Sequence, residues 1–166
     1  MDNYVDPKTL ESGNILNQLK MDLIENRTRE DFIFLLGCLR DSMVWVPTTA
    51  ILSERDLNTL VGLKVGDILT SQDEIRMRPD ILLSPDQKRW FPIFSQKKQI
   101  PEDYAKKFSI IRLPALRCLN MAHNTENLEG LILDAFTVPI QLPFVVADIM
   151  PELESHLKPE SDADVG

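Results

Sequence analysis

Few side chains in this sequence have the types and spacing that catalysis or metal binding requires. The 166-residue chain contains 2 histidines and 2 cysteines, and no two of them form a Cys-x-x-Cys or His-x-x-x-His pair. Cys118 and His123 suggest a Cys–His nucleophile, but an offset of five residues on a helix turns two side chains about 140° apart. Cys38 and Cys118 both lie among apolar neighbours, so we expect buried free thiols in preference to a disulfide or a nucleophile. No metal site is expected.

Phosphate and cofactor motifs are also absent from the sequence. Its 6 glycines are scattered singly, so neither a Walker-type loop nor a dinucleotide fingerprint is present. No serine lies in a Gly-x-Ser-x-Gly elbow. We therefore predict no catalytic residue and no cofactor from motifs. An enzyme or small-ligand site assembled from separated residues, such as Arg78, His123 and Asp134, stays open as the alternative.

Four residues make up the candidate partner-binding face: Arg76, Arg78, Trp90 and Asp134. Arg76, Arg78 and Trp90 lie on two predicted strands and, depending on register, share the outer face of a hairpin. Arginine and tryptophan dominate the binding energy of many protein interfaces. The alternative is that a helix covers this face and that Trp90 belongs to the core. Asp134 interrupts an apolar strand, so it is either a structural pairing partner or part of a binding site.

Helices are predicted where apolar residues recur every three or four positions. One covers residues 14–26, and a second begins at Thr28, where Asp31 follows three residues later in the pattern of a capping box. Gly37 lies inside this second helix, where glycine costs about 1 kcal/mol relative to alanine, and we take it as a sign of close packing. Further helices are predicted to start at Pro101 and Pro114 and to cover residues 144–153.

Strands are predicted between these helices, at residues 43–47, 75–84, 89–95, 109–113, 130–136 and 139–143. A short polar turn at 85–88 joins the second and third of them, which indicates an antiparallel hairpin. The interleaving of helices with hairpins predicts an α+β fold, with a mixed, largely antiparallel sheet packed by helices in a single domain.

The predicted domain covers residues 12–155. A flexible lead-in at 1–11 precedes it, and a disordered acidic tail at 156–166 follows it. Residues 48–66 have no clear pattern, and an insertion is expected there. Residues 152–166 contain five acidic side chains and one lysine, and so carry half of the net charge of −8.

Charge and hydropathy limit the partners of this chain. Outside its acidic tail the chain is only mildly acidic, which disfavours nucleic-acid binding because phosphate neutralisation needs a basic face. No apolar run approaches the roughly 20 residues of a membrane span. The first residues are polar and acidic, unlike a signal peptide, so we expect a cytoplasmic protein.

The order of several short motifs indicates a family. A helix and a strand ending at Val46-Pro47 precede Arg78-Pro79-Asp80-Ile81-Leu82-Leu83, and a turn then leads to Phe91-Pro92-Ile93-Phe94-Ser95. A charged helix and a late strand, Gly130-Leu131-Ile132-Leu133, follow. From about Phe32 to Leu142 this order resembles the N-terminal domain of the bacterial enhanced-serine-sensitivity (SseB) family. The resemblance implies an α+β module without established catalysis.

These observations favour a non-enzymatic module that binds a protein or peptide through one face or edge of its sheet. The segment Ile140–Leu142 is a candidate edge for the addition of a partner strand. The acidic body suits a basic partner, as a regulator or an immunity-type protein has. A self-associating domain, and therefore a homo-oligomer, is a further alternative.

Overall fold

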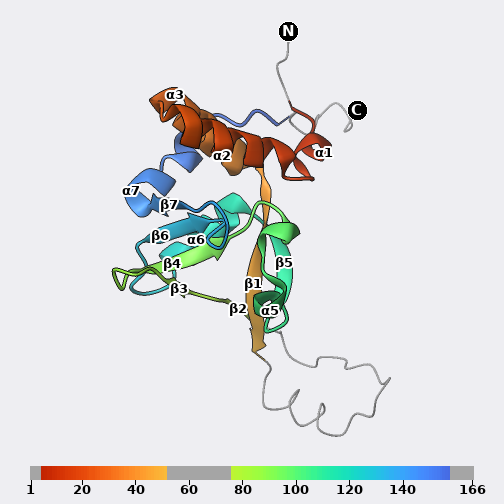
Figure 1. Ribbon diagram of the computed structural model, residues 1–166, viewed down its shortest axis with the longest axis vertical. Coiled ribbons are helices and arrows are strands. Elements are labelled where there is room, and N and C mark those ends of the chain that lie inside the picture. Colours follow the sequence, from red (N-terminus) through yellow and green to blue (C-terminus); the bar gives the residue numbers. More distant parts are fainter. Residues whose placement is uncertain (1–4, 52–75, 158–166) are drawn as a thin grey trace, which may run out of the picture.

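The computed structural model describes residues 5–51 and 76–157 (Figure 1). Within these ranges the helices are α1 (Pro7–Leu10), α2 (Asn14–Asn26), α3 (Arg29–Asp41), α5 (Glu102–Ala105), α6 (Ala115–His123) and α7 (Phe144–Ala147), with two short 3₁₀ helices, η1 (Lys97–Gln99) and η2 (Met150–Glu152). The strands are β1 (Met43–Ile51), β2 (Arg76–Pro79), β3 (Leu82–Leu83), β4 (Arg89–Ile93), β5 (Ser109–Pro114), β6 (Gly130–Leu133) and β7 (Ile140–Pro143).

The fold is α+β, as predicted, and its strands are divided between two sheets. One sheet has the order β2-β1-β5 and is antiparallel throughout. The other has the order β3-β4-β6-β7, in which β4 and β6 are parallel and the other neighbours are antiparallel. The backbones of Trp45 and Phe94 exchange two hydrogen bonds of 2.9 Å, and this bridge joins the two sheets into a single domain.

The strand predicted at 75–84 is wrong in one respect, because the chain changes sheets in the middle of it. Its first part, β2, pairs with β1, whereas its second part, β3, pairs with β4. The N–H of Asp80 donates to the carbonyl of Pro47 at 2.9 Å, and this is the last bond that ties the segment to β1. Pro79 lacks an N–H and so cannot extend a ladder on both sides. The predicted hairpin is therefore confirmed only for β3 and β4.

Local sequence explains the two long helices. Thr28 accepts a hydrogen bond from the N–H of Asp31 at 3.0 Å, as the capping pattern predicted, and α3 begins at the next residue. Arg27 is the residue that follows α2, and it has a left-handed φ of 53°. This conformation turns the chain toward Thr28, which caps α3. These two features place α2 and α3 side by side as a helical layer (Figure 1).

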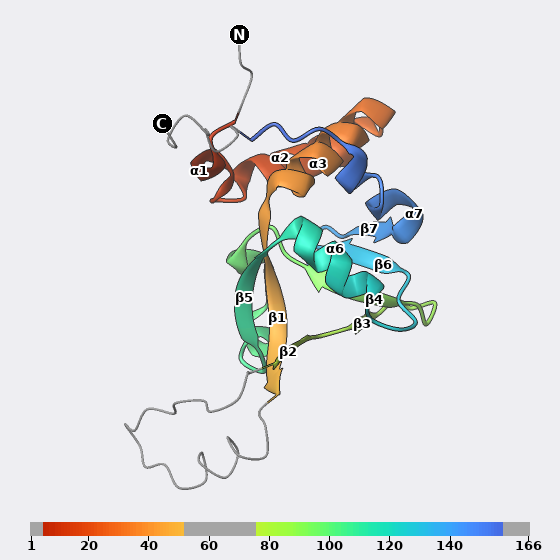
Figure 2. The same cartoon turned by 180° about the vertical axis from the view of Figure 1, so that it is seen from behind.

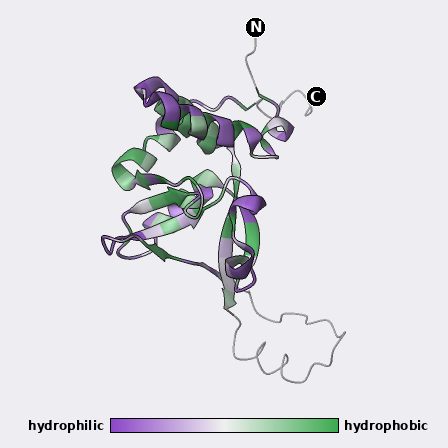
Figure 3. Ribbon diagram, in the orientation of Figure 1, coloured by the Kyte–Doolittle hydropathy of each residue, from purple (hydrophilic) through white to green (hydrophobic). Residues whose placement is uncertain are grey.

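The core lies between this helical layer, α6 and one face of the four-stranded sheet. Phe91 and Ile93 of β4, Leu131 and Leu133 of β6, and Leu142 of β7 are all fully buried. Figure 2 shows α6 lying across this face, and Figure 3 shows the hydrophobic colouring of β6 and α7 in contrast to the hydrophilic outer turns of α3. No helix of the described residues lies on the opposite face of the sheet in Figure 1.

The ends of the chain differ in detail from the predicted domain limits. Residues 7–10 of the expected lead-in form α1, and Val5 pairs with Leu157 in an isolated bridge. The helix predicted at 144–153 is divided into α7 and η2, with Pro151 near the start of the second. Residues 52–66 of the expected insertion and 158–166 of the expected tail lie outside the described residues. No helix in the described part of the chain is long and apolar enough to cross a bilayer.

Gly130, at the start of β6, is the position where a side chain is least compatible with this fold. A Cβ atom there would lie 2.1 Å from the carbonyl oxygen of Leu142 and 2.8 Å from the Cα of Pro143. We expect Gly130→Ala to lower the free energy of unfolding by about 1–3 kcal/mol, measured by urea titration, because β7 must move away from β6. Gly37→Ala is the control, since a Cβ at Gly37 meets nothing within 4 Å. Equal stability of Gly130→Ala and the wild type would contradict this contact.

Candidate functional site

The structure separates the four residues of the predicted partner-binding face. Trp90 lies on β4 and is 3% exposed, and Asp134 is fully buried. Arg78 is exposed on β2, which belongs to the other sheet. Arg76 is also in β2, but its side chain lies outside the description. Among the described side chains of this set, no hydrogen bond or ion pair joins any two.

Asp134 forms a buried ion pair that holds the helical layer to the sheet. Its Oδ2 lies 2.6 Å from Nζ of Lys20, and both side chains are at most 1% exposed. The N–H of Ser95 donates to Oδ1 at 2.9 Å, and the Ser95 hydroxyl donates to Oδ2 at 2.8 Å. One carboxylate thus accepts three bonds from two other segments. This geometry fits the structural alternative for Asp134, and it places the carboxylate away from any surface.

Sequence reasoning missed Lys20, although its spacing contained a signal. Lys20 follows Leu16 by four residues, and these two are the buried residues of α2. A lysine on the apolar stripe of a helix requires a buried acceptor, because an isolated ammonium group is costly to remove from water. Asp134 was the one acidic residue noted inside an apolar strand. The two observations together predict the pair, but neither does so alone.

The outer face of the four-stranded sheet contains a hollow, which we call the Trp90 hollow. Because Phe91 and Leu131 point into the core, their neighbours Trp90 and Ile132 point to the opposite face. The hollow has a volume of about 430 Å³, within the range of ligand pockets. Its lining includes Leu82, Leu83, Trp90, Ile132, Phe136 and Gln141.

The hollow has a buried floor and an exposed apolar rim. Trp90 and Ile132 form the floor and are 3% and 8% exposed, whereas Leu83 and Phe136 at the rim are 65% and 44% exposed. The indole N–H of Trp90 donates to Oγ of Ser84 at 3.1 Å, which fixes the ring in place. All of the described residues that line the hollow are uncharged. The arrangement is a preformed recess for a bulky apolar group.

Aromatic packing fixes the rim at Phe136. Its ring stacks on Phe94 with centroids 6.0 Å apart and lies 4.9 Å from the ring of Tyr104. The Tyr104 hydroxyl donates to the carboxylate of Asp80, and burial together with this neighbouring charge raises the pKa of Tyr104. Tyr104 therefore stays protonated at neutral pH and remains a donor. These contacts hold Phe136 in place although nearly half of its surface is exposed.

The edge beside the hollow, β7, is poorly suited to the addition of a partner strand. The N–H of Asp134 donates to Ile93, so even-numbered residues of β6 bond to β4 and odd-numbered residues bond to β7. In the β6–β7 register, Gln141 faces Ile132 and therefore directs its own N–H and carbonyl outward. The neighbouring outward positions are Pro139 and Pro143, which have no N–H. One donor remains along this edge, as in edge strands that resist pairing.

The remaining titratable side chains do not assemble a second reactive site. Cys38 and Cys118 are free thiols; Cys118 is buried as predicted, whereas Cys38 is only partly buried. Burial raises the pKa of Cys118 to about 12. His123 lies 2.5 Å from the Asp148 carboxylate, and its ring stacks on Phe144 with centroids 4.2 Å apart. In the described ranges, no three His, Cys, Asp or Glu side chains are grouped as metal ligands are. Arg78, His123 and Asp134 have no hydrogen bond or ion pair with one another there.

Comparison with known proteins gives one match. A family model described as the SseB protein N-terminal domain matches residues 21–149. This range includes the resemblance seen between Phe32 and Leu142, and it extends to α2 and α7. No curated protein and no solved structure matches the chain.

The buried ion pair generates a prediction about stability. Asp134→Asn retains the shape of the side chain and its tolerance of the left-handed φ of 53°, but leaves the Lys20 ammonium group without a counter-charge. We expect a loss of about 3–5 kcal/mol in the free energy of unfolding, measured by urea titration.

A double variant serves as the control for this prediction. Lys20→Met combined with Asp134→Asn removes both charges, so we expect it to be more stable than Asp134→Asn alone. If the two single substitutions were additive in the double variant, the two groups would not be energetically coupled, contrary to their 2.6 Å contact.

Proposed function

The chain belongs to the SseB family, because it matches the N-terminal domain of that family. We propose that the chain is a non-enzymatic module that binds a protein or peptide partner at the Trp90 hollow. The observation that supports the proposal is a preformed recess with uncharged described lining, on a sheet face that no helix of residues 5–51 and 76–157 covers (Figure 1). In this proposal the protein acts in the bacterial cytoplasm as a regulator or an immunity-type protein.

The exposure of large apolar side chains supports a binding role for this face. The rim residues Leu83 and Phe136 are 65% and 44% exposed. Water contact with such side chains is unfavourable by about 25 cal/mol for each Å² of apolar surface. Contiguous apolar surface of this kind marks interaction sites in many proteins. A partner that covers the rim removes this unfavourable contact.

The lining of the hollow defines the chemistry of the partner group. None of its described lining residues is ionisable, so a charged group inserted among them would lose hydration without gaining a counter-charge. A leucine, methionine or phenylalanine side chain fits this requirement. The Gln141 amide and the single outward N–H of β7 lie at the border and can bond to the partner backbone. The net charge of −8 on the whole chain favours its encounter with a basic partner.

The hollow also lacks the groups that acid–base or nucleophilic catalysis uses. Ser84 is the hydroxyl-bearing residue among the described residues that line the hollow. Its oxygen already accepts a hydrogen bond from Trp90, and its O–H donates to Asp86 or to the carbonyl of Lys88. No imidazole or carboxylate lies among the residues of its lining to activate that hydroxyl. The chemistry of the site therefore supports recognition over turnover.

The two tryptophans of the chain provide a direct test. Peptides selected from a random library on the immobilised full chain are titrated into labelled protein, and the two indole N–H signals are followed by NMR. We expect the Trp90 signal to shift and the Trp45 signal to stay, because Trp45 lies outside the hollow, between Lys97 and Arg112. Selected peptides should depend on one bulky apolar residue. Peptides that shift Trp45 alone, or a selection that yields none, would count against the proposal.

Matched surface variants locate the binding face. Leu83→Asp places a charge on the rim and should weaken peptide binding at least tenfold, or about 1.4 kcal/mol. Val145→Asp is the control, since Val145 is 81% exposed on α7 and does not line the hollow. Equal losses in the two variants would contradict the assignment. If the molecular mass of the wild type rises with protein concentration and that of Leu83→Asp does not, a second copy of the chain occupies the hollow. That result would overturn the proposal of a separate partner.

A further inference from the structure

A second pocket lies in the helical layer and shares no lining residue with the Trp90 hollow. It is bordered by α1, α2, α3 and the segment 153–157, it is open to solvent at Phe34, which is 59% exposed, and its volume is about 330 Å³. We call it the Gly37 pocket. Its apolar lining includes Leu10, Leu19, Ile33, Gly37, Cys38 and Leu153. An apolar cavity of about 150 Å³ already holds benzene, so this pocket has room for a larger molecule.

Gly37 keeps this space open. The glycine lies in the interior of α3 and is buried, and the sequence suggested close packing around it. That prediction is wrong, because a Cβ built at Gly37 meets no atom within 4 Å. Glycine is unfavourable inside a helix relative to alanine, and here neither φ nor crowding requires it. Its effect on the structure is to leave volume in the pocket.

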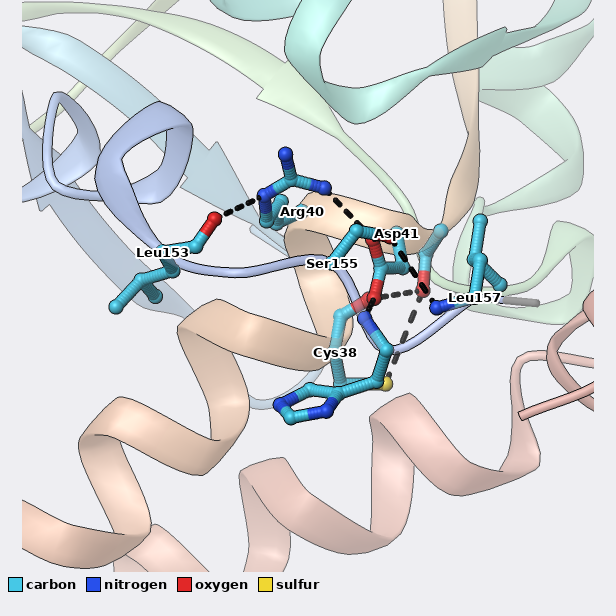
Figure 4. A network of polar contacts seen from close by, with 8 residues as sticks. Cys38, Arg40, Asp41, Leu153, Ser155 and Leu157 are labelled. Atoms are coloured by element: carbon cyan, nitrogen blue, oxygen red, sulfur yellow. Dashed lines mark hydrogen bonds and ion pairs between the residues drawn. The ribbon is translucent and has the colours of Figure 1, made fainter. Parts of the chain in front are cut away.

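The wall opposite α3 is held firmly by hydrogen bonds. Figure 4 shows the segment 153–157 passing the end of α3, where Arg40 and Asp41 reach toward it. Arg40 Nε donates to the carbonyl of Leu153 at 2.7 Å, and the Ser155 hydroxyl donates to Oδ1 of Asp41 at 2.7 Å. The N–H of His156 donates to the other carboxylate oxygen at 2.9 Å. The pocket is therefore formed before any ligand binds.

The charged groups of the pocket favour a cation. Asp41 and the exposed Glu154 line it, whereas no lysine or arginine is among its described lining residues. Asp41 is engaged by Arg40, Ser155 and His156. Glu154, in contrast, has no hydrogen bond or ion pair with another described residue. The other described lining residues are apolar apart from His156 and Cys38. The backbone of His156 is held by Asp41, and burial raises the pKa of the Cys38 thiol, which keeps that group uncharged.

We propose that the Gly37 pocket binds a small molecule with an apolar body and a protonated amino group. The apolar body occupies the space beside Gly37, Leu10 and Leu19, and the ammonium group pairs with Glu154. This inference does not depend on the Trp90 hollow, because the two lie in different layers of the molecule.

Three unbranched probes of six carbon atoms each test the proposal: hexylamine, 1-hexanol and hexanoate. Each is titrated into the full chain while backbone amide signals are followed by NMR. We expect saturable shifts at Gly37 and Cys38 with hexylamine, and binding of hexanoate at least threefold weaker. Glu154→Gln should bring hexylamine down to the level of 1-hexanol. The amide of Gly130, outside the pocket, serves as the reference signal.

Substitutions at Gly37 make the assignment falsifiable through stability as well as binding. Gly37→Leu fills the space and should abolish binding, whereas Gly37→Ala should weaken it and raise the midpoint of urea unfolding. Hexylamine binding that survives Gly37→Leu would overturn the site. Hexanoate binding as tight as that of hexylamine would overturn the amine assignment, and the absence of saturable shifts with all three probes would overturn the pocket as a ligand site.

Discussion

The buried pair of Lys20 and Asp134 is the interaction on which the arrangement of layers depends. Removing both charges from water is costly, and the cost is offset only because the carboxylate accepts from Lys20 and twice from Ser95. The same junction fixes the start of α2, since Gln96 Nε2 donates to the carbonyl of Ser12 at 2.9 Å. Gly13 is required there, with φ of 74° and with a Cβ position only 2.2 Å from the Ser95 carbonyl. Charge, backbone shape and close approach therefore specify the same contact between α2 and the end of β4.

This contact determines which surface remains for binding. With α2, α3 and α6 on one side of the four-stranded sheet, the residues that alternate with the core residues face outward and form the Trp90 hollow (Figures 1 and 2). The edges of that sheet are short or poor in donors, because β3 has two residues and prolines border Gln141 on β7. Recognition is thereby concentrated on a face, where side-chain shape rather than backbone pairing selects the partner.

Local sequence patterns predicted the helices and strands of this fold better than they predicted which strands and side chains pair with one another. Thr28 and Asp31 predicted the start of α3, apolar alternation predicted β4, and a mostly apolar run predicted β6, because caps and hydrophobic patterns act over a few residues. The division into two sheets was not predicted, since alternation in 75–84 does not say which strand each half pairs with. Lys20 and Asp134 are 114 residues apart, and the hollow joins side chains from Leu82 to Gln141. Trp90 was identified as a candidate, but its role as a floor beneath Leu83 and Phe136 depends on tertiary packing.

The two pockets differ in chemistry, and each is lined by a sequence neighbour of one member of the same ion pair. Leu19, next to Lys20, lines the Gly37 pocket, and Ala135, next to Asp134, lines the Trp90 hollow. Such proximity transmits binding energy only if the intervening element has two arrangements of similar free energy. A buried pair whose carboxylate accepts three hydrogen bonds has one favourable arrangement, and breaking it leaves a charge in the interior. The ion pair therefore acts as a rigid support that preforms both pockets, so a ligand in one is not expected to change the affinity of the other.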